Sequence, residues 1–349
     1  MTDLTRRTAL SALLAGGAGT AAVGTSLPAF AAPTFVDVPS SNPFAREISW
    51  LAERGITTGW TVSGRREFRP HASIQRDAFA TFLYRYDGTS GYEPPSTSPF
   101  TDLPPRAQFY REITALHEAG IINGWPDGSF RPRNHITRDA VAAMLFRGYG
   151  DPRFRAPRTS TFADLTPRRQ FYREICWLAD TGITQGYPDG TFRPLDPISR
   201  EAMAAFLFRL HQRGADAAFD AQVASLITRT VNQERRARGL QPLRRDTRID
   251  TVAATWSAQL TTADFRHNPD YGEQMPSGWR RVAENIAYVG SSDRTADAVA
   301  TDLVRNWMDS DGHRQNILSE AVNTIGVGVA TRHEGGLTYV FATQNFGQY

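Results

Sequence analysis

Three arginines stand at equivalent places in the sequence and have the chemistry to bind an anion. Arg76, Arg138 and Arg200 recur at a spacing of 62 residues, and each begins a stretch with the pattern of an amphipathic helix. A cation in the first turn of a helix opposes the helix dipole at a cost of about 0.3–1 kcal/mol, whereas an exposed helix N-terminus attracts anions. Because a guanidinium group can grip a carboxylate or phosphate with two hydrogen bonds, we predict that these arginines bind a ligand.

An ion pair between neighbouring repeats is the alternative role for each arginine. Three acids at equivalent positions, which we also predict to lie in the polysaccharide site, can supply the carboxylate: Asp37, Asp102 and Asp164. Three aromatic residues at equivalent turn positions either stack on sugar faces or belong to the core: Trp60, Trp125 and Tyr187. Gln75 replaces the threonine or serine of the other copies, so we expect the Arg76 copy to be the weakest site.

A second set of residues, His267, Glu284 and His313, can bind a metal ion. Two imidazoles and one carboxylate form an incomplete zinc shell, in which an open position would hold water. The same groups can instead form a structural hydrogen-bond network. Their spacing of 17 and 29 residues differs from the compact His-Glu-x-x-His pattern, so the spacing alone does not indicate a zinc hydrolase.

The arginines belong to a unit that occurs three times. Phe-Arg-Pro recurs at Phe68, Phe130 and Phe192. Each unit predicts a first helix that ends at Gly-Ile, a turn, and a second amphipathic helix. We place the units at residues 34–87, 99–150 and 161–213, with connectors rich in Pro, Ser or Thr between them.

A different domain is expected from residue 217 to residue 349. The pattern predicts helices over 218–238, 250–262 and 295–308, followed by two strands over 325–330 and 337–344. This order of elements indicates an α+β domain.

The repeats resemble S-layer homology domains. The resemblance rests on a degenerate Ile-Thr-Arg-Ala-Glu signature, seen in Ile74 to Ala78, Ile136 to Ala140 and Ile198 to Ala202. It implies a mainly α-helical, pseudo-threefold arrangement of the three repeats. It also implies binding of secondary cell-wall polysaccharide, which often carries acidic pyruvate ketals.

The C-terminal domain resembles the CAP superfamily in its bacterial form without disulfides. The motifs are Phe265 to Asn268, Glu284 to Ala287, Gly312 to Leu318 and Gly326 to Val329, together with Trp307. The resemblance implies an α-β-α sandwich and a cleft that binds zinc or another divalent cation through His267, Glu284 and His313, or that holds a lipid or wall component. Members of the family place a fourth acidic ligand three residues after the tryptophan; this position is Ser310 here, and Asp309 or Asp311 can take its place.

The first 31 residues predict an export signal. Arg6 and Arg7 precede a stretch of small and apolar residues, and an Ala-x-Ala pattern ends at Ala31. The paired arginines favour the twin-arginine type, and a general secretory signal is the alternative. No later apolar run reaches the ~20 residues of a membrane span.

The composition argues against a nucleic-acid partner and against a fold held by disulfide bonds. All 39 cationic residues are arginine, and the net charge of +3 does not indicate a nucleic-acid partner. The single cysteine, Cys176, excludes an intramolecular disulfide framework. We therefore expect an exported protein of the cell wall or cell surface that binds acidic polysaccharide through its repeats. A metal-dependent hydrolase of wall components or peptides is the alternative.

Overall fold

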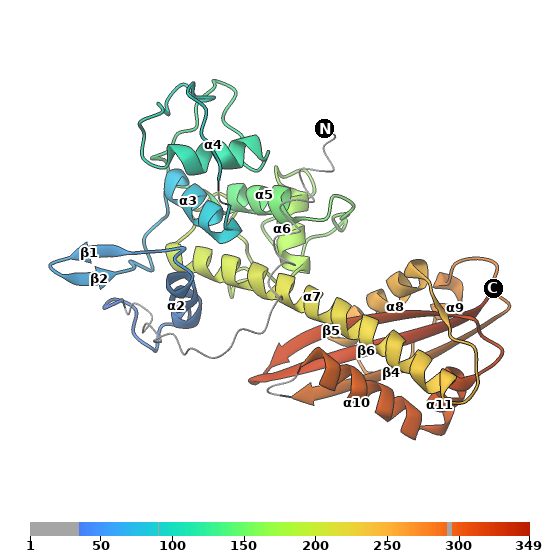
Figure 1. Cartoon of the computed structure of the whole chain (residues 1–349). Coiled ribbons are helices and arrows are strands. Elements are labelled where there is room, and N and C mark those ends of the chain that lie inside the picture. The colour runs from blue at the N-terminus through green and yellow to red at the C-terminus, as the bar shows by residue number, and fades with distance from the viewer. Residues whose placement is uncertain (1–34, 90, 292–294) are drawn as a thin grey trace. The chain divides into compact units, whose positions relative to one another are not determined.

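The computed structural model describes residues 35–89, 91–291 and 295–349 (Figure 1). The chain divides into two compact units, one ending at Arg213 and one running from Gly214 to Tyr349. The predicted export signal lies outside the described residues.

In the N-terminal unit every repeat contributes two helices. The pairs are α2 (Ala45–Glu53) with α3 (Arg76–Asp87), α4 (Tyr110–Glu118) with α5 (Arg138–Tyr149), and α6 (Tyr172–Asp180) with the start of α7 (Arg200–Arg236). A glycine with a positive φ follows each first helix, at Gly55, Gly120 and Gly182. The left-handed conformation ends the helix there, as the Gly-Ile pattern predicts.

A ring of backbone hydrogen bonds joins the three repeats. Ile74 N donates to Ile198 O, Ile198 N to Ile136 O, and Ile136 N to Ile74 O, at 3.1, 3.0 and 3.0 Å. One hydrophobic core extends through all three repeats, and the phenylalanine of each Phe-Arg-Pro segment is fully buried in it. Because the ring closes, each repeat contacts both of the others.

The first repeat differs from the others in its turn. Strands β1 (Trp60–Val62) and β2 (Arg65–Glu67) form an antiparallel hairpin in the place where the other two repeats have a Pro-Asp-Gly turn, at residues 126–128 and 188–190. Ser63 and Gly64 connect the strands with φ of 48° and 77°. Two successive positive φ values are typical of a type I′ turn, whose twist suits a two-residue hairpin.

The C-terminal unit is a mixed sheet between two layers of helices. Strands β3 (Arg244–Arg245), β4 (Arg281–Ser291), β5 (Thr324–Glu334) and β6 (Leu337–Gln348) are arranged in the order β3-β5-β6-β4. Helix α8 (Thr247–Leu260) covers one face, whereas α7 from residue 214 onward, α10 (Ala296–Asp309) and α11 (Asp311–Leu318) belong to the other (Figure 1). Short helix α9 (Tyr271–Gln274) follows α8.

Two glycines of β5 allow α8 to approach the sheet. A Cβ on Gly328 would lie 2.0 Å from the backbone nitrogen of Ala254, and one on Gly326 would lie 2.3 Å from the backbone carbon of Ile249. Such distances leave no room for a side chain. In the Gly-Val-Gly-Val segment, the two glycines therefore face α8, whereas the two valines face the core on the other side of the sheet.

The C-terminal unit differs from the sequence-based expectation in several elements, among them strand β3 and helices α9 and α11, which were not expected. The helix expected over 218–238 is the later part of α7, which begins at Arg200, and strand β4 was not expected. Among the described residues, no helix is both long enough and apolar enough to cross a bilayer.

Candidate functional site

The three helix-initial arginines are buried where one repeat meets the next. Arg76, Arg138 and Arg200 are 6%, 4% and 4% exposed. Their Nε atoms donate to the carbonyl oxygens of Phe130, Phe192 and Phe68, at 2.8, 2.7 and 2.7 Å. Each arginine therefore satisfies a carbonyl of another repeat instead of projecting freely into solvent.

The predicted aromatic residues lie at the same junctions. The guanidinium carbon lies 4.2 Å from the ring centroid of Trp60 for Arg200, 4.9 Å from Tyr187 for Arg138, and 6.0 Å from Trp125 for Arg76. These distances are those of cation–π contacts. We call the three groups the inter-repeat clusters. Each combines an arginine of one repeat with the turn aromatic of another.

The predicted acids lie next to the clusters but bind the backbone of their own repeat. Asp37 accepts from the backbone N–H groups of Phe68 and Arg69 at 2.8 and 2.6 Å. Asp102 and Asp164 make the same pair of bonds in the second and third repeats. Because both carboxylate oxygens have backbone donors, the acids hold the Phe-Arg-Pro segments in position, a role different from the ion pair considered from the sequence.

A second arginine in each cluster was not assigned from the sequence. Arg69, Arg131 and Arg193 have φ of 59°, 58° and 56°, which is unusual outside glycine. Their guanidinium groups lie 4.7, 4.2 and 4.0 Å from the rings of Trp60, Trp125 and Tyr187. Their side chains are 39–45% exposed. The threefold Phe-Arg-Pro pattern itself was the available signal, since it repeats an arginine at each of these positions.

A groove of about 440 Å³ adjoins the cluster of Arg200 and Trp60. Residues of all three repeats line it, and Gln75, Asp77 and Arg133 are among them. Burial raises the pKa of the Asp77 carboxyl, and burial lowers the pKa of Arg200 to about 10, so the arginine keeps its charge at neutral pH. The groove thus places a cation, a buried carboxyl group and an exposed aromatic ring side by side.

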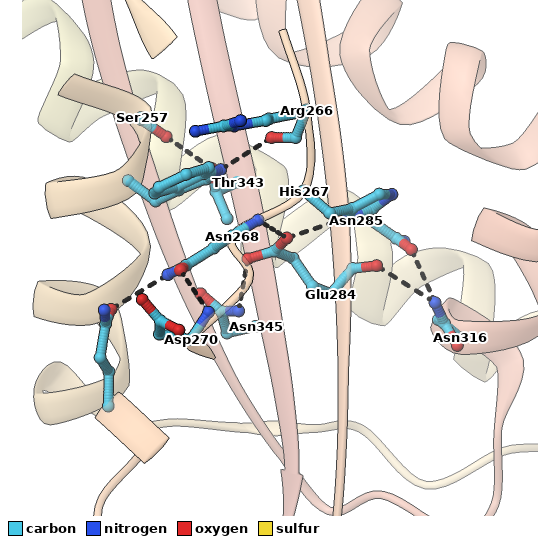
Figure 2. A network of polar contacts seen from close by, with 12 residues as sticks. Ser257, Arg266, His267, Asn268, Asp270, Glu284, Asn285, Asn316, Thr343 and Asn345 are labelled. Atoms are coloured by element: carbon cyan, nitrogen blue, oxygen red, sulfur yellow. Dashed lines mark hydrogen bonds and ion pairs between the residues drawn. The ribbon is translucent and has the colours of Figure 1, made fainter. Parts of the chain in front are cut away.

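The second candidate site lies beside strand β4 of the C-terminal unit (Figure 2). His267 Nδ1 lies 2.9 Å from Oε1 of Glu284, and the backbone N–H of Asn268 donates to the same oxygen at 2.9 Å. Asn345 Nδ2 donates to Oε2 at 3.2 Å. Glu284 is buried, whereas the His267 side chain is 56% exposed. The carboxylate therefore holds the imidazole and leaves its Nε2 toward the outside.

His313 approaches the same place from α11. The centroids of the His267 and His313 rings are 6.3 Å apart. Asn285 Nδ2 donates to the carbonyl of His313 at 3.1 Å, and Asn316 Nδ2 donates to Asn285 Oδ1 at 2.9 Å. Burial, and then the neighbouring His267, lower the pKa of His313. The structure thus brings together the three residues that the sequence singled out.

The geometry does not fit a metal centre with three protein ligands. Both oxygens of Glu284 are directed to hydrogen-bond donors of the protein. Asp311 is exposed and pairs with Arg314, and Asp309 is exposed as well. In the described part of the chain, no three His, Cys, Asp or Glu side chains are placed to hold a metal ion. Glu284 acts here as the partner of an imidazole.

A unit of three repeats with two helices each, followed by a unit with one sheet between helices, defines a modular protein with two different domain types. The model of the S-layer homology domain matches residues 34–80, 99–142 and 161–204. The model of the cysteine-rich secretory protein family, CAP, matches residues 228–346. The chain therefore consists of three S-layer homology domains followed by a CAP domain. The S-layer homology domains point to the cell surface or cell wall as its location.

Known proteins resemble parts of the chain. Cell surface glycoprotein 1 of Acetivibrio thermocellus is 37% identical over 93 residues, which are 26% of this chain and 4% of that protein. The cellulosome-anchoring protein of the same organism is 30% identical over 121 residues, 34% of this chain and 27% of that protein. An extracellular protein containing a SCP domain from Bacillus anthracis, solved by crystallography, is 25% identical with a TM-score of 0.31, covering 38% of this chain and 43% of that chain. The chain spans about a quarter or less of the length of the two curated relatives.

Proposed function

We propose that this protein attaches non-covalently to an acidic cell-wall polysaccharide through its S-layer homology domains and displays the CAP domain at the cell surface. The observation that carries the proposal is the groove at the cluster of Arg200 and Trp60. An exported chain with such a groove is suited to hold wall polymer without a covalent bond.

The chemistry of the groove favours an anionic sugar polymer. Arg200 and the exposed Arg133 both line the groove, and a guanidinium group can bind a carboxylate such as a pyruvate ketal. Trp60 is 39% exposed and offers a ring face to the apolar side of a sugar. Residues 35–213 contain 23 arginines and 19 acidic residues, so the repeats carry a net charge of about +4 that attracts an anionic polymer.

The test is co-sedimentation of the purified full chain with purified wall polysaccharide. Arg133 is 70% exposed on its side chain, so it can be removed with little effect on folding. Trp60 is 39% exposed and its ring contacts Arg200, so circular dichroism melting must show that its variant is folded. We expect Trp60→Ala and Arg133→Ala to lower the fraction that pellets, and added salt to lower it further. Arg158→Ala, which removes an exposed arginine of a connector, is the matched control and should pellet like the parent chain.

Two results would contradict the proposal. One is a parent chain that does not pellet with the polymer. The other is pelleting that survives both groove substitutions unchanged.

A second candidate function, hydrolysis of a wall component or a peptide, is favoured by the His267–Glu284 pair. A buried carboxylate that holds an imidazole by Nδ1 leaves Nε2 to take up or release a proton, which is the arrangement of a general base. The ring of His313 lies 6.3 Å from that of His267, centroid to centroid. Release of soluble fragments from purified wall by the parent chain, abolished by His267→Ala and not by Trp279→Ala, would support this function. A wall that stays intact would exclude it for that substrate.

A further inference from the structure

Two exposed aromatic side chains lie on the CAP domain, on the same face of the sheet as Glu284. Phe265 is 46% exposed and Tyr288 is 48% exposed. Their rings meet edge to face, with centroids 5.1 Å apart and an interplanar angle of 72°. Phe265 belongs to the segment that leads from α8 to His267, whereas Tyr288 belongs to the edge strand β4. We call this pair the aromatic platform.

The platform is held rigidly from beneath. Tyr288 stacks on Phe341, which is 5% exposed, at 5.5 Å and 25°. The guanidinium group of Arg332 lies 5.4 Å from the ring of Phe341 and donates to the carbonyl of Thr261. The indole N–H of Trp256 donates to the carbonyl of Arg266 and ties down the segment that carries Phe265. Rings that are already ordered lose little entropy when a ligand covers them.

The surroundings of the platform are polar, and the domain as a whole is slightly acidic. Asp264, Arg266 and His267 are exposed in the same segment as Phe265. Residues 214–349 contain 14 arginines and 16 acidic residues, a net charge of about −2. A membrane-binding surface would need a larger apolar area and a cluster of basic residues. A small rigid aromatic surface with donors and acceptors at its rim matches instead a neutral sugar, which has an apolar ring face and hydroxyl groups around its edge.

We propose that the aromatic platform of Phe265 and Tyr288 is a binding subsite for a neutral glycan chain. The sugar ring lies on Tyr288 and Phe265, and its hydroxyl groups reach the polar side chains of the 264–267 segment. This subsite is separate from the groove of the repeats and selects a ligand of different charge.

The position of the platform links it to the His267–Glu284 pair. Glu284, Ile286 and Tyr288 alternate with residues that face the other side of β4, so they share one face of the strand. Four residues of strand separate Glu284 from Tyr288 by about 13 Å. A glycan chain that starts on the platform and follows β4 therefore passes His267.

The experiment is a calorimetric titration of the full chain with chitohexaose, a neutral hexamer of β-1,4-linked N-acetylglucosamine. We expect Tyr288→Ala and Phe265→Ala each to weaken binding about fivefold to tenfold, equivalent to about 1–1.4 kcal/mol. Tyr288→Phe keeps the ring and should stay within about twofold of the parent chain. Trp279→Ala removes another exposed aromatic residue of the same domain, 40% exposed, and serves as the matched control.

Circular dichroism melting shows which variants are folded. If Tyr288→Ala does not fold, Phe265→Ala carries the test, because Phe265 is exposed and lies outside the helices and strands. The proposal is overturned if the parent chain does not bind chitohexaose. It is also overturned if binding survives loss of either ring, or if Trp60→Ala abolishes it while Tyr288→Ala does not. Pelleting with phosphatidylglycerol vesicles that depends on Tyr288 would show a lipid surface instead and would equally overturn it.

Discussion

Replacement of Arg138 by leucine should destabilise the N-terminal unit even when no ligand is present. The guanidinium group is 4% exposed, donates to Phe192 O at 2.7 Å, and lies 4.6 and 4.9 Å from the rings of Phe192 and Tyr187. Loss of a hydrogen bond from a charged donor costs about 1.5–3 kcal/mol. Loss of the desolvated cation–π contacts adds about 0.5–2 kcal/mol, and the two effects overlap. We therefore expect a loss of about 2–4 kcal/mol.

Hydrogen exchange of the full chain, read by mass spectrometry of its peptides, can assign this loss to one unit. A change of about 2–4 kcal/mol corresponds to exchange that is roughly 30-fold to 700-fold faster in the most protected amides. It should occur in peptides of residues 138–149 and leave those of residues 324–348 unchanged. The exposed Arg158, changed to leucine, should have an effect of less than about 0.5 kcal/mol. If Arg138→Leu leaves exchange unchanged but abolishes binding of wall polymer, the arginine acts only through the ligand and the structural reasoning is refuted.

Three further predictions concern the CAP domain and can be checked by thermal melting. Gly328→Ala should destabilise it by more than about 3 kcal/mol because the new Cβ would overlap the backbone of α8, whereas Gly312→Ala meets no atom within 4 Å and should be neutral. Burial raises the pKa of Asp220 to about 6, above its value in the unfolded chain. This group therefore makes the domain less stable as the pH rises from about 4 to 6. Asp220→Asn should remove that pH dependence and raise the melting temperature at pH 8. Glu284→Ala should cost about 3–5 kcal/mol, because it removes the acceptor of three hydrogen bonds, including that of His267, and equal melting temperatures would contradict this.

The fold of the repeats was largely predictable because the same local rules act three times. The Gly-Ile ends of the first helices and the apolar stripes of the second helices specify the helix pairs without knowledge of the tertiary structure. The environment of the arginines was not predictable in the same way. The argument from the helix dipole assumes that Arg138 lies at the exposed N-terminus of an isolated helix. In the structure, the N-terminus of α5 packs on the third repeat, and the Arg138 side chain is buried there.

Strand β4 was missed for a related reason. Glu284 and Asn285 interrupt its apolar pattern, and polar residues in such a place usually indicate a loop. In the structure both are buried on opposite faces of the strand, where Asn345 and Gln344 pair with them across the register. A buried polar pair is tolerated when its hydrogen bonds are made. The partners lie some 60 residues away along the chain, so a local pattern could not reveal them.

The assignment of residues to a site changes once the clusters are seen to span repeats. From the sequence, Gln75 and Arg76 are neighbours and belong to one copy, which is why Gln75 was expected to weaken the site of Arg76. In the structure Gln75 lines the groove of Arg200, whereas Arg76 reaches Phe130 and Trp125. A substitution in one repeat therefore alters a site whose cation comes from another. Because the ring of repeats is closed, no copy contains a complete site of its own, and removal of any one repeat should impair two clusters at once.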